Sequence, residues 1–180
     1  MLGSAAPTVR NHGGIAMVLG VFDLHAYTIL HVAISLVGIV TGFVVIFGMV
    51  GGKRLDGWTF WFLLFTVLTS LTGFGFPYGH LLPSHVLGII SLVVLLVAIV
   101  ARYRFDLEGK WRWVFVIAAA VAQWFNLFVL VVQGFQKVPA LRALAPTQSE
   151  PPFQIAQAIV LVVVIILAVA AVRKFRPAIA

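Results

Sequence analysis

The stretch ILHVAISLVGIVTGFVVIFGMV, residues 29–50, decides the fold: it is 22 residues long and contains no Asp, Glu, Lys or Arg. A helix rises about 1.5 Å per residue, so roughly 20 apolar residues cross the hydrocarbon of a bilayer. A second such run, SHVLGIISLVVLLVAIV, covers residues 84–100. Each run carries a histidine near its start, His31 and His85. The sequence therefore predicts two membrane helices with an imidazole near one end of each.

The composition places the whole chain in a membrane. Of its 180 residues, 62% are hydrophobic and 9% are charged, whereas soluble domains have about 25% charged residues. The absence of cysteine excludes thiolate metal sites, cysteine-ligated clusters and disulfides. The formal charge of +7 comes from basic residues in short loops between apolar runs, where they set membrane orientation. We therefore expect the lipid bilayer as the partner, and no nucleic acid.

Hydropathy predicts one all-α domain, a polytopic membrane helix bundle with five transmembrane helices. Residues 1–26 form an N-terminal tail and an interfacial segment, and residues 177–180 form a C-terminal tail. Between the two tails lies the transmembrane domain, residues 27–176. Its expected spans are 27–50, 58–76, 84–103, 113–133 and 153–172. The apolar stretch 15–22 is too short to span about 30 Å. It either lies in the interface or extends the first helix.

The distribution of Lys and Arg predicts an N-out, C-in orientation. With five spans, nine basic residues fall on one side and three on the other, and the basic excess marks the cytoplasmic side. Tryptophans gather at the same ends of the helices, as expected for an interfacial aromatic belt. The nine are Lys53, Arg54, Arg102, Arg104, Lys110, Arg112, Arg173, Lys174 and Arg176; the three are Arg10, Lys137 and Arg142.

This topology puts His31 and His85 in the outer half of the membrane, at depths that differ by about 3 Å. Two imidazoles at similar depth on parallel helices are suited to ligate haem b or a metal ion. Ser35 and Gly38 share the helical face of His31, and Gly88 shares that of His85. These small residues either leave space for a flat macrocycle or let neighbouring helices pack closely.

The fourth span contributes Gln123 and Asn126, which need hydrogen-bond partners in lipid and should point into the bundle. With the histidines they would line an outward pocket for haem, a quinone or a lipid, or simply join helices. His80, in the outer turn, is an alternative ligand. None of the five acidic residues lies inside a span, which disfavours ion-coupled transport. No catalytic triad, phosphate loop or HExxH motif is present.

The chain resembles small bacterial multi-pass membrane proteins of unknown function. The resemblance lies within residues 30–133, in the segments HVAISLVGIVTGF, KRLDGW, SLTGFGF and RYRFDLEGKWR. Those proteins often have a histidine near the position of Lys53. The resemblance implies a bacterial cytoplasmic membrane and no particular activity.

Three functional hypotheses follow from the sequence. The first is a haem-binding electron-transfer protein with His31 and His85 as axial ligands. The second is a non-catalytic accessory subunit of a larger membrane complex, since the third and fifth spans have no polar face. The third is a membrane protein that binds a lipid or quinone without haem.

Overall fold

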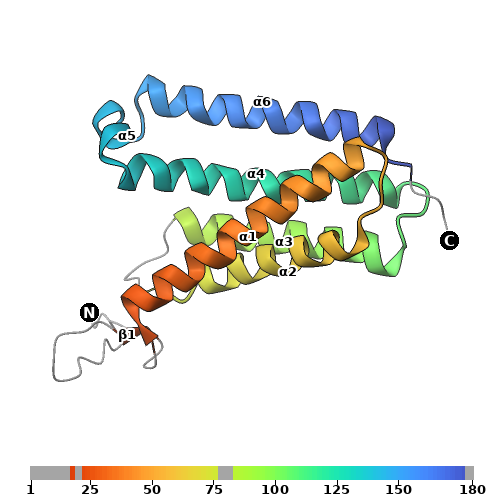
Figure 1. Ribbon diagram of the computed structural model, residues 1–180, viewed down its shortest axis with the longest axis horizontal. Helices are drawn as coiled ribbons and strands as arrows, with labels where there is room; N and C mark the ends of the chain where they lie inside the picture. The colour runs from red at the N-terminus through yellow and green to blue at the C-terminus, as the bar shows by residue number, and fades with distance from the viewer. Residues whose placement is uncertain (1–16, 19–21, 77–82, 177–180) are drawn as a thin grey trace, which may run out of the picture.

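A computed structural model of the protein describes residues 17–18, 22–76 and 83–176 (Figure 1). The described chain consists of helices joined by turns and loops, with two short paired strands at its start. In chain order its elements are β1 Met17–Val18, β2 Phe22–Asp23, α1 Leu24–Val50, α2 Asp56–Gly73, α3 Pro83–Ile99, the π-helical turn η1 Val100–Arg104, α4 Trp111–Lys137, α5 Pro139–Leu144 and α6 Pro151–Lys174.

Four of these helices are long and apolar enough to cross a membrane: α1, α3 with η1, α4 and α6. They match the first, third, fourth and fifth predicted spans, with ends shifted by a few residues. The second predicted span corresponds to α2, which is 18 residues long. α2 is not among these candidates.

Helices α1 to α4 form a four-helix bundle. α1 and α3 each pack against both α2 and α4, so α1 and α3 occupy diagonal corners. α6 lies outside this bundle, alongside α4 and against α1 (Figure 1). The hydrophobic core is built around Val45, Phe62, Leu95 and Phe115. The predicted parallel pair that carries His31 and His85 is therefore the diagonal pair.

The outer surface is apolar along the helices. α6 buries only Val164 and Ala171 among its 24 residues, and large side chains such as Ile159 and Ile166 are exposed. A soluble protein rarely exposes apolar surface on this scale. The distribution agrees with a protein whose helices face lipid.

The structure changes one expectation about the connections and narrows another. Residues 134–152, between the fourth and fifth predicted spans, were expected to form a loop. They are partly helical, because α4 continues to Lys137 and α5 begins with Pro139 at its first position, where a missing N–H is tolerated. Of the stretch 15–22, the described residues form β1 and the first residue of β2, which pair antiparallel, while α1 begins only at Leu24. The stretch therefore does not extend the first helix. Residues 15, 16 and 19–21 lie outside the described part.

An ion-pair cluster closes the end of the bundle where α1 leads into α2 and α3 into α4. Asp56 lies 3.0 Å from Arg54 and 2.6 Å from Arg102. Asp106 lies 2.5 Å from Arg54 and 3.0 Å from Arg102. The Arg102 side chain is buried. The hydrogen bond from Arg54 holds the pKa of Asp106 below its ordinary value of 3.8.

We predict that Asp106→Asn lowers the thermal unfolding temperature at pH 7 and that the difference from wild type closes on acidification. The pKa of the carboxyl is lowered by folding, so its contribution to stability is present above about pH 4 and is lost as the pH falls through the folded-state pKa. Asparagine tolerates the left-handed backbone of this position (φ 44°). The variant therefore removes the negative charge without adding backbone strain.

The measurement is thermal unfolding in detergent between pH 7 and pH 3. Glu108→Gln is the matched control, because Glu108 is an exposed acid of the same loop and forms no ion pair with a described residue. A wild-type advantage over Asp106→Asn that stays constant with pH would contradict the prediction.

Candidate functional site

His31 is held against the C-terminal turn of α2. Its Nδ1 lies 2.7 Å from Oγ1 of Thr72, and its ring meets the Phe76 ring edge-on at 5.2 Å between centroids. The Thr72 hydroxyl also lies 2.7 Å from the carbonyl oxygen of Leu68. A carbonyl can only accept, so this contact uses the single hydroxyl hydrogen. Nδ1 must then be the donor to Thr72, which leaves the lone pair of His31 on Nε2.

The hydroxyl of Tyr27 strengthens the same attachment. It donates a 2.7 Å hydrogen bond to the Thr72 carbonyl, and its ring packs edge-on against Phe76. Gly75 is required at this crossing, because a Cβ there would overlap the Tyr27 hydroxyl. Tyr27 and His31, one helical turn apart, thus bind the end of α2 together.

His85 approaches the same segment from α3. Its side chain is buried and its ring stacks on Phe74, with 5.6 Å between centroids and 26° between the planes. The Phe74 ring also covers Gly88, where a Cβ would lie 3.0 Å from it. Both histidines therefore contact the segment 72–76. Between the two described imidazoles there is neither a hydrogen bond nor a ring contact.

The space beside the predicted small residues is filled by the protein itself. A Cβ at Gly38 would lie 3.4 Å from the Thr66 hydroxyl. One at Gly42 would overlap the Gln123 carboxamide and lie 2.8 Å from the Phe62 ring. Ser35 donates to the His31 carbonyl within its own helix. These distances support close helix packing at the glycines, which was one of the two interpretations of the small residues beside the histidines.

Gln123 and Asn126 point into the bundle, as predicted. Gln123 is fully buried and donates from Nε2 to the Ile39 carbonyl at 3.0 Å, which joins α4 to α1. Asn126 donates to the Thr66 hydroxyl at 3.2 Å, which joins α4 to α2. Oε1 of Gln123 has no partner among the described residues. Both amides act here as hydrogen-bonding links between helices.

Ser70 and Ser91 add a third link, since their hydroxyl oxygens lie 3.1 Å apart in a hydrogen bond that joins α2 to α3. With the His31–Thr72 contact, polar bonds tie α2 to each of its neighbours. Sequence reasoning placed polar residues here but did not identify Thr72 as the partner of His31.

Two open hollows occur elsewhere, around α5. Their volumes are about 400 and 460 Å³, and both are lined by Gln136, Arg142 and Pro146. Neither is lined by His31 or His85. Among the described residues, no three His, Cys, Asp or Glu side chains come close enough to hold a metal ion. His80 lies outside the described residues.

No protein family, curated protein or solved structure matches this chain.

We predict that Gly42→Ala destabilises the bundle by about 1–3 kcal/mol, the usual effect of overpacking a filled interior. The added methyl group would collide with the Gln123 carboxamide and the Phe62 ring. Chemical unfolding in mixed detergent micelles measures the change.

Gly57→Ala is the control, because Gly57 also lies in a helix and a Cβ there meets nothing within 4 Å. It should leave stability unchanged or raise it by up to about 1 kcal/mol. Equal effects of the two substitutions would show that Gly42 is not tightly packed.

Proposed function

We propose that this protein is an integral membrane bundle of five spans that serves as a non-catalytic subunit of a larger membrane complex. The observation that carries this proposal is the filled interior. Along the helices that carry the two histidines, the space beside the glycines is occupied: Thr66 contacts Gly38, Gln123 fills the position deeper in the bundle at Gly42, and Phe74 covers Gly88 next to His85. Together with the interhelical hydrogen bonds, this packing favours a role in assembly over chemistry in the bundle interior.

The outer surface supports the same role. α6 exposes large apolar side chains along one face, among them Ile155, Ile159, Val162 and Ile166. Its small residues, such as Ala158 and Ala170, belong to the residue types that allow membrane helices to approach closely. α6 therefore has surface available for a helix of another subunit after its packing on α4 and α1.

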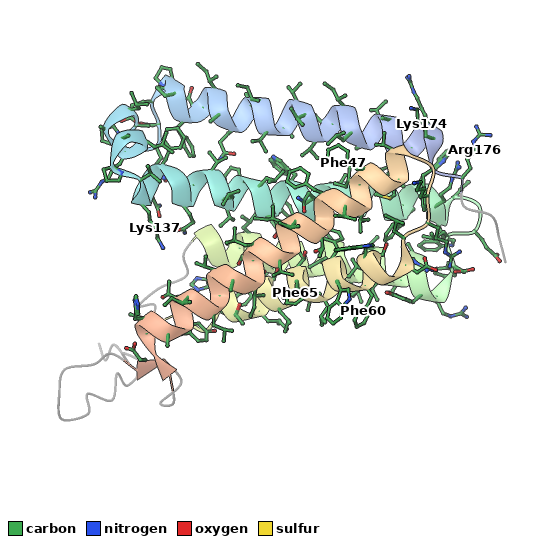
Figure 2. The ribbon with its side chains drawn as sticks, viewed as in Figure 1. Phe47, Phe60, Phe65, Lys137, Lys174 and Arg176 are labelled. Carbon is green, nitrogen blue, oxygen red and sulfur yellow. The ribbon has the colours of Figure 1, made fainter. Side chains whose placement is uncertain are left out.

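We also propose that α2 crosses the membrane, which gives an N-out, C-in protein of a bacterial cytoplasmic membrane. The 18 residues of α2 span about 27 Å at 1.5 Å per residue, close to the hydrocarbon thickness. Lys174 and Arg176 lie at one end of the molecule and Lys137 at the other (Figure 2). The basic excess at the first end supports a cytoplasmic position for it.

Haem binding through His31 and His85 is the second candidate, and the tautomer of His31 favours it. Histidine ligands commonly donate their other ring N–H to a protein acceptor, and Nδ1 of His31 donates to Thr72 while Nε2 keeps its lone pair. The donor type therefore fits haem b. The space does not, because Phe74 covers the face of His85 and Gly88. Haem consequently ranks below the subunit role.

Cysteine labelling tests the orientation, and the chain has no native cysteine to interfere. In intact cells, a membrane-impermeant maleimide should label Lys137→Cys and should label Lys53→Cys only after the membrane is permeabilised. Labelling of both variants in intact cells would place them on one side and contradict a crossing by α2.

Purification from the native membrane in mild detergent tests the two functions. A subunit role predicts a colourless protein with stoichiometric protein partners. Haem binding predicts a Soret absorption band that His31→Ala or His85→Ala abolishes, while His25→Ala, an exposed histidine on the same helix as His31, leaves it intact. A pure, colourless protein without partners would refute both proposals.

A further inference from the structure

Three segments meet at the basic end of the molecule. They are the turn after α1, the start of α4 and the end of α6. Gly52 packs against the Lys174 carbonyl, 3.4 Å from where its Cβ would be. Arg112 of α4 donates from Nη1 to the Phe175 carbonyl at 2.7 Å. These contacts bring Lys53, Arg112 and Lys174 to one place, although they are far apart in sequence.

Within the described part of the chain, carboxylates do not neutralise the positive charge at this junction. Asp56 and Asp106 are both engaged by Arg54 and Arg102. Among the described residues, no carboxylate lies within ion-pair distance of the other cations at the junction, and four of those cations are exposed. We call this group the basic junction: Lys53, Arg112, Arg173, Lys174 and Arg176.

Apolar and aromatic surface adjoins the charge. The Arg112 guanidinium lies 5.6 Å from the ring centroid of Trp113, whose exposed fraction is 49%. Tryptophan prefers the level of the lipid headgroups. Phe47 is 56% exposed and lies toward the same end as Lys174 (Figure 2). Further along α6, Val169 and Ile166 are exposed. A ligand here would meet cations at one level and apolar side chains at the next.

We infer that the basic junction binds an anionic phospholipid of the cytoplasmic leaflet. The phosphate is held by Lys53 and Lys174, and the acyl chains lie along the exposed surface of α1 and α6. Basic pockets between membrane helices on this side are suited to such headgroups. A soluble anion would match the charge alone, whereas a phospholipid matches both the charge and the apolar surface beneath it.

The test uses the full-length protein and measures binding of fluorescent phosphatidylglycerol in detergent micelles, with fluorescent phosphatidylcholine for comparison. The double variant Lys53→Gln, Lys174→Gln should bind phosphatidylglycerol on the order of tenfold more weakly, since each surface cation strengthens attraction to anionic lipid several-fold. The matched variant Lys137→Gln, Arg142→Gln removes the same charge at the opposite end and should bind as wild type does.

Three results would overturn the inference. They are equal weakening in both double variants, equal binding of the two lipids by the wild type, and displacement of the lipid by millimolar inorganic phosphate, which would indicate a site for soluble anions. Thermal unfolding checks that each variant is folded. If the first double variant does not fold, Arg173→Gln, Arg176→Gln takes its place with the same expected loss.

Discussion

Inside the hydrocarbon of a membrane a polar group finds no water, and the bundle is arranged around this shortage of hydrogen-bond partners. Gln123 meets a carbonyl of α1, and Asn126 meets a hydroxyl of α2. Ser70 meets Ser91, and His31 meets Thr72. Each bond joins a different pair of helices. The hydrogen bonds that give these polar groups a partner therefore also fix the relative positions of the helices.

The carboxamide of Gln123 also explains why the interior has little room. It reaches α1 only because Gly42 offers no side chain, and the amide then fills the space that the glycine leaves. At the outer end, Phe74 does the same over Gly88. The glycines that could have formed a cradle instead receive side chains from neighbouring helices. The Thr72 hydrogen bond orients the His31 ring, and no described residue bonds the lone pair on its Nε2.

Apolar length predicted α1, α3, α4 and α6 well, because crossing a bilayer requires a minimum number of apolar residues whatever the neighbours are. The inward direction of Gln123 and Asn126 followed from the same physics. The partners could not be predicted, since they depend on how helices distant in sequence rotate and pack. Thr72 as the partner of His31, Phe74 over His85 and the filling of Gly42 are of this kind. α5 was missed because it has only six residues, too few for a hydrophobic period.

The π-helical turn η1 changes which way the end of α3 faces. Its closing bond runs from the Phe105 N–H to the Val100 carbonyl, one residue further than in an α-helix. The extra residue rotates everything that follows, so Arg102 is buried beside two carboxylates while Tyr103 and Arg104 are exposed. Removing a single residue here would restore a regular helix but turn the guanidinium away from its acids. A protein of the same fold that is one residue shorter within η1 would therefore be expected to lack the equivalent of Arg102, or of both Asp56 and Asp106.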